Sequence, residues 1–425
     1  MKRRTFLKSA AAAGAAAVMP AGLLGLGSAC TSNNSEAAAA AAAWDFDEVI
    51  DRAGTWSIKQ RRATDGKLAM WIADMDFRTD PYVSRALRER LDRDVMGYTY
   101  GPDEFFDAIV GWERKMHGFD VPREWVEYAP GVITSLCQTY LTFTQPGDRI
   151  VVQPPVYDPF KGYAQRLGRE VVDNPLIYRD GRYEMDFEGL DRLYDKRVKA
   201  LVLCNPHNPV GIIWPKETLA RLADWCAAHE VIVFSDEIHA DLALYGRRHT
   251  PFCSVSDTAA RIGIEFCAPT KAFNLAGITG TAYAIIPDPA KRQRFHDTLS
   301  NAKLREASIP TLVATIAAYT HDTDWLEALK RYLEGNIDRT VAVLDGSRGI
   351  RAIRPEASFL VWLDCRALGL PQQELMDLFN EKAGVVVNNG AGYGPGGEGF
   401  IRLNVGCPRS ILEEALKRIQ DALRA

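Results

Sequence analysis

Residues 200–239 read ALVLCNPHNPVGIIWPKETLARLADWCAAHEVIVFSDEIH, and this stretch decides the fold. Two short apolar runs, 200–206 and 231–236, flank an amphipathic segment at 216–229. Short β-rich runs of this kind are typical of strands buried on both faces of a sheet. A strand, a helix and a second strand in this order indicate a parallel pair joined by a helical crossover. The stretch therefore predicts an α/β protein.

The same alternation continues on both sides of this stretch. Further apolar runs occupy 149–155 and 264–271, and another amphipathic segment occupies 186–194. Alternating strands and helices favour a doubly wound, mostly parallel sheet with helices on both faces. In such sheets a ligand binds outside the carboxyl ends of the strands. Because Asp236 and Lys271 both stand where a predicted strand ends, we expect them to face one crevice.

The C-terminal part of the chain has a different pattern. Residues 325–344 have the length and periodicity of a long helix, and 411–423 form another amphipathic helix. Apolar and polar residues alternate in 358–364 and 399–404, as they do in half-buried strands. These segments predict a smaller α+β domain.

Length and composition indicate a globular protein with more than one domain. The chain has 425 residues, of which 47% are hydrophobic and 25% charged, and its net charge of −4 gives no reason to expect nucleic-acid binding. We expect these divisions: an N-terminal segment that joins the small domain, 44–91; a large domain, 92–322; and the small domain, 323–425.

The N-terminus has the pattern of an export signal. Residues 1–29 are basic at the start, contain no acidic residue and continue into an Ala-rich apolar run. The pair Arg3 and Arg4, followed by Thr-Phe-Leu-Lys, is similar to a twin-arginine signal, which is a receptor-read address. We therefore expect a signal peptide at 1–29 and an exported protein.

Cys30 follows Gly-Ser-Ala and is similar to the lipidated cysteine of a lipobox. The polar and Ala-rich residues 30–43 then form a predicted tether before the fold. Lipidation would make the protein a periplasmic or membrane-anchored lipoprotein that contacts the membrane only through its signal or its lipid. The alternative is plain cleavage after Ala29, which leaves a free Cys30.

The eight cysteines do not predict a metal site. They include no C-x-x-C pair and no histidine at metal-ligand spacing, so we expect no bound metal. Several, such as Cys204, lie in apolar runs and are interpreted as small core residues, with few or no disulfides expected.

An ordered set of motifs carries a family resemblance. The sequences NPHNPVG at 205–211, SDEIH at 235–239 and APTK at 268–271 resemble, in this order, the fold-type I pyridoxal-phosphate enzymes of the aspartate aminotransferase superfamily. The cystathionine β-lyase branch of the MalY/PatB type is similar in further motifs: DRAGT (51–55), IADMDF (72–77), MGY (96–98), TKAFNL (270–275) and FIRLN (400–404). The resemblance implies a mostly parallel seven-stranded sheet and a pyridoxal 5′-phosphate cofactor.

The resemblance implies a catalytic role for Lys271, which would bond covalently to the cofactor and then act as the base for the substrate Cα proton. Burial of a lysine at a strand end is costly unless the amine reacts or pairs, and it lowers the pKa of the amine. Asp236 would pair with the pyridine nitrogen of the cofactor. Taken alone, an aspartate at this position is more commonly a helix N-cap.

The resemblance also assigns contacts around the cofactor ring. Asn208 would donate to the phenolic oxygen, and Tyr157 would stack on the ring face. His239 would lie near the phenolic side, where a buried, neutral and packed imidazole is the preferred interpretation. Without the family, these residues are typical of a turn, a core aromatic and a core histidine.

The phosphate requires backbone donors at the beginning of a helix. The sequence PGVIT at 130–134 supplies them, with Val132 and Ile133 as candidates, and Thr270 adds a hydroxyl. Tyr98 resembles the tyrosine that reaches the phosphate of a neighbouring subunit. The resemblance therefore implies a homodimer with shared active sites.

The substrate carboxylate is assigned to Arg402, whose planar guanidinium matches a carboxylate, and to Ala73 in the IADMDF motif. Classical aminotransferases carry an arginine eight residues after the lysine, where this chain has Thr279. The lyase branch lacks that arginine too, so this position favours a lyase.

The predicted activity is cleavage of cystathionine- or cysteine-type L-amino acids to pyruvate, ammonia and a thiol. The alternatives are an aminotransferase or a racemase that acts on small amino acids. A binding or regulatory protein is a hypothesis of another class, but pure binding does not need Lys271.

Overall fold

The computed structural model describes residues 44–321 and 323–424. Residues Trp44–Ala425 form one compact unit. The predictions for the signal, Cys30 and the tether lie outside the described residues. Among the described residues, no helix combines the length and apolar character needed to cross a membrane.

The large sheet has seven strands in the order β2-β10-β9-β8-β7-β3-β4. All neighbouring pairs are parallel except those that β10 makes with β2 and β9. The fold-class prediction is therefore confirmed. The strands are β2 (Val126–Ala129), β3 (Arg149–Val152), β4 (Glu170–Asp173), β7 (Val198–Cys204), β8 (Ile232–Asp236), β9 (Gly263–Cys267) and β10 (Ala282–Ile285).

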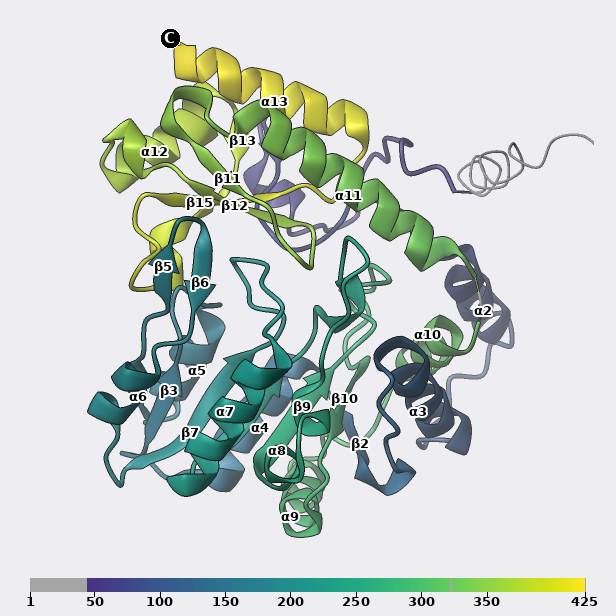
Figure 1. The fold of residues 1–425 in the computed structure, drawn as a ribbon. Helices are drawn as coiled ribbons and strands as arrows, with labels where there is room; N and C mark the ends of the chain where they lie inside the picture. Colours follow the sequence, from purple (N-terminus) through teal and green to yellow (C-terminus); the bar gives the residue numbers. More distant parts are fainter. Residues whose placement is uncertain (1–43, 322, 425) are drawn as a thin grey trace, which may run out of the picture. The chain divides into compact units, whose positions relative to one another are not determined.

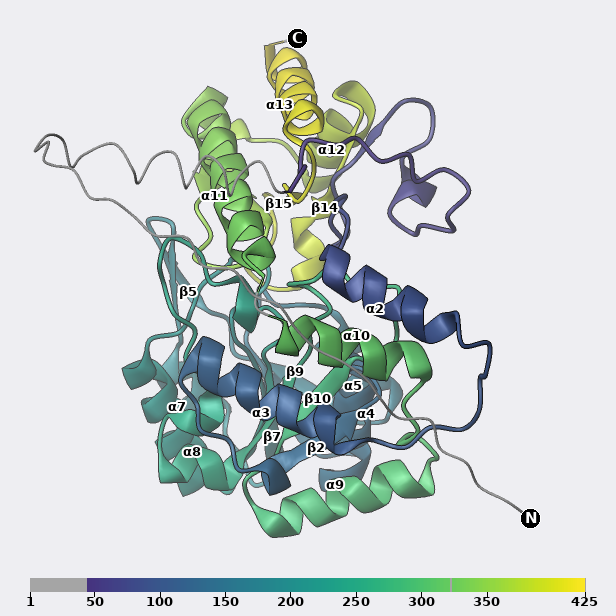
Figure 2. The same ribbon diagram turned by 90° about the vertical axis from the view of Figure 1, so that its right-hand side faces the viewer.

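Helices cover both faces of this sheet (Figure 1). One face packs against α4 (Val132–Phe143), α5 (Pro159–Arg166) and α9 (Pro289–Asn301). The other face packs against α3 (Asp103–His117), α6 (Phe187–Leu193), α7 (Lys216–Ala228), α8 (Asp257–Ile262) and α10 (Ile309–Thr320). Figure 2 shows α3 beside α10, with α2 (Pro81–Leu91) also against α10. The central strands are buried on both faces, as their apolar sequences predict.

Several helices begin at local sequence signals. The side chains of Asp80, Asp288 and Ser308 accept hydrogen bonds from backbone N–H groups in the first turns of α2, α9 and α10. Each of these helices also has a proline at one of its first two positions, where the missing N–H is not needed. Such caps satisfy donors that have no partner inside the helix.

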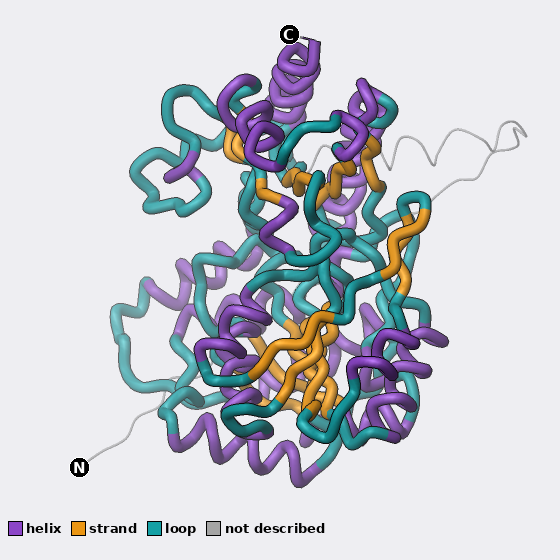
Figure 3. Tube along the Cα trace, turned by 90° about the vertical axis from the view of Figure 1, so that its left-hand side faces the viewer, coloured by secondary structure: helices purple, strands orange, loops and turns teal. Residues whose placement is uncertain are grey.

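A second, antiparallel sheet lies in the C-terminal part, in the order β11-β12-β15-β14. Figure 3 shows its strands as a group separate from the large sheet. The predicted long helix is α11 (Trp325–Leu344), and the predicted final helix is α13 (Arg409–Arg424). The other elements here are β11 (Arg351–Ile353), β12 (Leu360–Asp364), β13 (Val385–Val386), β14 (Asn388–Asn389), β15 (Phe400–Asn404) and α12 (Gln372–Asp377).

The N-terminal segment is attached to the C-terminal part by a short parallel pair, β1 (Leu68–Ala69) with β13. The exact domain boundaries stay predictions. The remaining elements are the hairpin β5 (Ile177–Arg179) and β6 (Arg182–Glu184), the π-helix η7 (Leu378–Lys382) and the 3₁₀ turns η1 (Gln60–Arg62), η2 (Arg123–Trp125), η3 (Ala240–Leu242), η4 (Phe252–Ser254), η5 (Ser347–Gly349), η6 (Arg366–Leu368) and η8 (Gly390–Tyr393).

Candidate active site

A cavity of about 550 Å³ lies where the carboxyl ends of β8 and β9 meet the N-terminus of α4 and strand β15. It brings together every predicted site residue in the described part of the chain except Tyr98. Those lining residues are Ala73, Val132, Ile133, Tyr157, Asn208, Asp236, His239, Thr270, Lys271 and Arg402. Their chemical roles stay predictions, but their convergence on one space is a structural fact.

Lys271 is half-buried, and its Nζ donates a hydrogen bond of 2.7 Å to the carbonyl oxygen of Ala73. Burial lowers the pKa of this amine to about 8, and the positive charge of Arg402 acts in the same direction. The amine is therefore much easier to deprotonate than an exposed lysine, as a nucleophile or base requires.

Asp236 ends β8 and is also buried. Burial raises the pKa of its carboxyl to about 7, while a hydrogen bond of 3.1 Å from the backbone N–H of Ile238 and the charge of Lys271 partly offset this. A cation placed against this carboxyl would restore its ionised form. Asp236 is followed by a 3₁₀ turn rather than by an α-helix, so the interpretation as a helix cap does not apply.

Arg402 lies on β15 and is buried, with 3% of its surface exposed. One guanidinium nitrogen donates to Asn208 Oδ1 at 3.0 Å, and another donates to the carbonyl oxygen of Trp71 at 2.9 Å. Its Nε has no hydrogen-bond partner within the described part of the chain. A surface ion pair is therefore excluded for Arg402, and the unpartnered N–H is suited to a carboxylate ligand.

The imidazole of His239 is buried, and burial lowers its pKa to about 3, so it is neutral. Tyr157 is half-buried, and burial raises the pKa of its phenol to about 12, so it carries its proton. Both side chains line the cavity as uncharged groups. They can pack against a planar ligand or donate one proton in a hydrogen bond.

The beginning of α4 forms a possible phosphate cradle. Gly131 precedes the helix with φ of 128°, in a region that favours glycine, and the first N–H groups of the helix follow it. Thr270 lies at the same end of the cavity, where its Oγ1 is 3.1 Å from Thr281 Oγ1. A helix N-terminus with free N–H groups favours a phosphate.

Several residues that were not predicted as site residues also line the cavity, among them Trp71, Asn388 and Tyr393. Trp71 directly precedes the IADMDF motif, Asn388 lies on β14, and Tyr393 ends the 3₁₀ turn η8. The ring of Tyr393 lies 5.3 Å from the guanidinium carbon of Arg402. No sequence signal pointed to Tyr393, because loop positions have no periodic pattern.

Tyr98 is fully exposed in the stretch between α2 and α3 and does not line the cavity of its own chain. Val95, Met96 and Tyr100 are exposed in the same stretch. This loop therefore exposes four large apolar or aromatic side chains to solvent. Its predicted contact is with a second subunit, which lies outside a one-chain structure.

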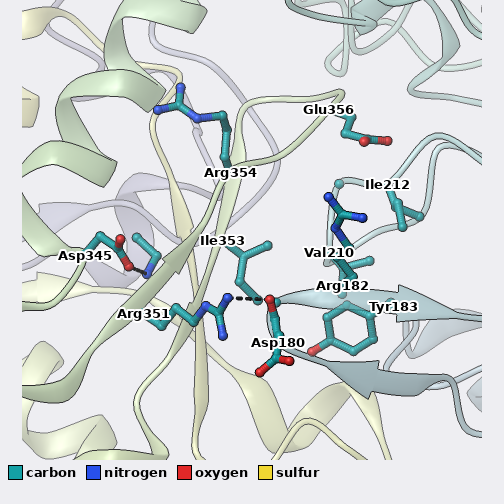
Figure 4. Close-up of a pocket in the computed structure, with 13 residues that line it drawn as sticks. Asp180, Arg182, Tyr183, Val210, Ile212, Asp345, Arg351, Ile353, Arg354 and Glu356 are labelled. Atoms are coloured by element: carbon teal, nitrogen blue, oxygen red, sulfur yellow. Dashed lines mark hydrogen bonds between the residues drawn. The ribbon is translucent and has the colours of Figure 1, made fainter.

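A second cavity, of about 340 Å³, lies between the β5–β6 hairpin and β11 (Figure 4). Two of its charged groups bind neighbours: Arg351 donates to the carbonyl oxygen of Asp180, and Asp345 accepts from the backbone N–H of Ala352 at 3.1 Å. None of the predicted site residues lines it. It offers no lysine for covalent chemistry.

Comparisons with known proteins agree with this geometry. Cystathionine β-lyase PatB of Bacillus subtilis is 43% identical over 387 residues, which is 89% of this chain and 100% of that protein. Cystalysin of Treponema denticola, solved with pyridoxal 5′-phosphate, has 31% identity and a TM-score of 0.86 over 90% of this chain and 99% of its own. A pyridoxal-phosphate-bound putative aminotransferase of Clostridium difficile has 37% identity and a TM-score of 0.86 over 89% of this chain and 100% of its own.

Two family profiles match the sequence. The twin-arginine translocation signal matches residues 1–20, so the chain carries this export signal. The profile of class I and II aminotransferases matches residues 73–419, which is most of the chain and includes Lys271 and Arg402. The chain belongs to the class I and II aminotransferase family.

Proposed function

We propose that this protein is a pyridoxal-phosphate-dependent C–S β-lyase that cleaves cystathionine- or cysteine-type L-amino acids to pyruvate, ammonia and a thiol. The observation that carries the proposal is that Lys271, whose amine has a pKa of about 8, lines the same cavity as Arg402. The 43% identity to a cystathionine β-lyase supports the substrate class.

The residues of the cavity fit the cofactor at each of its functional groups. Lys271 would bond to the aldehyde and Asp236 would pair with the pyridine nitrogen. Asn208 would donate to the phenolic oxygen, and the N-terminus of α4 would hold the phosphate. The raised pKa of Asp236 also supports a bound cofactor, because a buried carboxylate is costly unless a cation pairs with it. The protonated pyridine nitrogen would be that cation. When bound, pyridoxal phosphate supplies a ring that accepts the electron pair of the substrate Cα–H bond.

The chain's own groups then perform the remaining tasks. The Arg402 guanidinium holds the substrate α-carboxylate and so fixes which Cα bond faces the amine. Lys271 Nζ takes the Cα proton, which its lowered pKa permits near neutral pH. Thr279 lines the cavity where classical aminotransferases carry an arginine, which supports β-elimination over amino transfer.

The decisive experiment is pyruvate release from cystathionine by the purified protein loaded with cofactor, with no keto acid added. Equimolar pyruvate, ammonia and thiol are expected. Lys271→Ala is the control and should release none. Absence of pyruvate, together with amino transfer that depends on a keto acid, would assign an aminotransferase instead. A panel of L- and D-amino acids in the same assay detects racemisation.

We also propose that the active unit is a homodimer in which Tyr98 reaches the phosphate site of the partner. The exposed loop residues Val95, Met96, Tyr98 and Tyr100 support this, because so many apolar side chains on one stretch mark an interaction site. Sedimentation of the purified protein at several concentrations tests it. A monomer at all concentrations would contradict the proposal.

We propose further that the exported chain is lipidated at Cys30. The twin-arginine profile at residues 1–20 supports export, and the sequence before Cys30 supports lipidation. A Cys30→Ser variant is expected to move from the membrane fraction to the soluble periplasmic fraction. An Arg3→Lys, Arg4→Lys variant should stay in the cytoplasm. Soluble wild-type protein with residue 30 as a free thiol would favour plain cleavage.

A further inference from the structure

The backbone of residues 71–75, which we name the strap, runs past the amine of Lys271. Each of its five carbonyl groups accepts a hydrogen bond from a side chain far away in the sequence. The donors are Arg402 and Asn388 to Trp71, Asn404 to Ile72, Lys271 to Ala73, Lys59 and Asn404 to Asp74, and Asn274 to Met75. The position of the strap is therefore set by its surroundings rather than by local secondary structure.

The strap touches the two groups on which substrate binding depends. The carbonyl oxygen of Ala73 receives Lys271 Nζ at 2.7 Å, and that of Trp71 receives the Arg402 guanidinium at 2.9 Å. A displacement of the strap would therefore move the guanidinium away from its position beside Asn208. Misplacement of a positioning group by about 1 Å can cost about 100-fold in rate.

Lys59 anchors the strap from the side away from the cavity. Its side chain is completely buried, although lysines are rarely buried without a partner. Its Nζ donates to the carbonyl oxygen of Asp74 at 2.9 Å and forms an ion pair of 2.6 Å with Asp76 Oδ2. Lys59 itself does not line the cavity.

Arg52 completes this anchor from the same N-terminal segment. It pairs with Asp74 Oδ2 at 2.8 Å and with Asp76 Oδ1 at 2.7 Å. Asp74 and Asp76 are therefore paired with Arg52 and Lys59, two cations that precede the strap in the sequence. Within this cluster the Lys59 amine is fully buried, so loss of its partner Asp76 would leave a buried charge unpaired, which is costly.

We propose that Lys59, through its ion pair with Asp76, is a positioning residue that holds the strap and thereby aligns Arg402 for the α-carboxylate of the ligand. The inference rests on the proposed function only in assigning that carboxylate to Arg402. It does not depend on whether the reaction is elimination or amino transfer.

Two oximating probes separate a positioning role from a purely structural one. Aminooxyacetate and methoxyamine both react with the cofactor through an –ONH₂ group, but only aminooxyacetate carries a carboxylate. Their second-order rate constants are measured on cofactor-loaded protein from the loss of its visible absorbance. In Lys59→Met the aminooxyacetate constant is expected to fall about tenfold relative to the methoxyamine constant.

Lys67→Met is the matched control. Lys67 belongs to the same N-terminal segment and forms an ion pair of 2.6 Å with Glu381, but it does not contact the strap. Its variant should keep the wild-type ratio of the two constants. Asp76→Asn removes the carboxylate that pairs with Lys59 and changes the shape of the side chain little. If Lys59→Met does not fold, the ratio measured in Asp76→Asn tests the proposal instead.

An unchanged ratio in a folded Lys59→Met or Asp76→Asn variant would overturn the proposal, since loss of fold or cofactor affects both probes alike. A failure of the proposed lyase activity would give a different result. Wild-type protein would then release no pyruvate, but it would still react with aminooxyacetate and methoxyamine at different rates. A wild-type ratio near one would show instead that Arg402 does not receive the carboxylate.

Discussion

At the residue scale, the reactivity of Lys271 is set by two influences that reinforce each other. Burial lowers the pKa of the amine, and the Arg402 guanidinium lowers it further, while Asp74 and Asp236 act in the opposite direction. Arg402 thus has two consequences at one site. It offers an N–H without a partner to a ligand, and it keeps the neighbouring amine partly unprotonated.

Replacing Arg402 with methionine should therefore raise the pKa of Lys271. In the cofactor-free protein only the unprotonated amine attacks pyridoxal phosphate, so the capture rate rises with pH through the pKa of about 8. In Arg402→Met we expect the midpoint of this rise to move to higher pH. Stopped-flow absorbance across pH 6–10 measures it, and an unmoved midpoint would exclude the electrostatic effect.

At the element scale, the phosphate cradle depends on how α4 begins. Gly131 adopts φ of 128° directly before the first helical residue, a backbone conformation that side chains disfavour. A Cβ at this position would meet Thr134 Oγ1 at 3.6 Å, which is an ordinary contact. The requirement for glycine is therefore conformational rather than steric.

In Gly131→Ala, the alanine would be strained by about 1–3 kcal/mol in the backbone conformation of Gly131. We expect the backbone to rotate out of this conformation and turn the first N–H groups of α4 away from the phosphate, which weakens cofactor binding. We expect the dissociation constant of pyridoxal phosphate to rise about tenfold or more. Fluorescence titration of the cofactor-free protein measures it. Gly147→Ala, at φ of 89° in a turn that does not line the cavity, is the control and should keep wild-type affinity.

The C-terminal turn of α3 carries a second electrostatic feature. His117 is buried, which opposes its charge, but its 3.0 Å hydrogen bond to Asp241 and the nearby Glu113 carboxyl raise its pKa to about 9. The end of a helix also favours a cation. The hydrogen bond between His117 and Asp241 therefore joins the end of α3 to η3, the turn that follows β8. Strand β8 ends at Asp236, the residue proposed to bind the cofactor.

His117 therefore predicts a pH dependence of stability. Because its folded-state pKa lies above the value of 6.5 in the unfolded chain, its stabilisation is complete below pH 6.5 and is lost as pH rises through about 9. The loss is about 3 kcal/mol at most. Urea unfolding of cofactor-free protein at pH 6 and pH 9.5 should show a smaller difference in His117→Gln than in wild type. An equal difference would assign the dependence to other groups.

At the scale of the whole molecule, the cavity is assembled from both sheets and the N-terminal segment. Asp236 ends β8 and Lys271 follows β9 in the large sheet. Arg402 lies on the small sheet, and Ala73 lies on the strap. Any relative movement of the two sheets changes the distance between the amine and the guanidinium. Tyr98 is exposed on the same chain, and in the proposed homodimer it would extend this assembly to the partner.

Mixing two inactive variants tests whether sites are shared. Lys271→Ala removes the amine from its own site, and Tyr98→Ala would remove a phosphate contact from the partner's site. After the two proteins are unfolded and refolded together, each mixed dimer carries one intact site and one doubly altered site. Activity should therefore reappear in the mixture. No recovery, with dimers present, would place Tyr98 outside the partner's site.

Local patterns were sufficient for much of the fold and for part of the site. The runs that became β7, β8 and β9 were predicted because apolar β-rich segments between turns have few other uses. Lys271 and Asp236 were predicted to face one crevice because each stands where a predicted strand ends, and the family resemblance implied their roles. Trp71 and Asn388 were not predicted, since their roles arise only from neighbours distant in the sequence.

The sequence by itself determined the α/β class, the order of its elements, the export signal and the residues able to perform the chemistry. Only the tertiary structure decided that Lys271 lies against the carbonyl oxygen of Ala73, 198 residues away, and that Lys59 is buried beside Asp76. The physical reason is that burial and charge act through space. The pKa of an amine depends on which groups surround it, and the chain brings those groups together only when it folds.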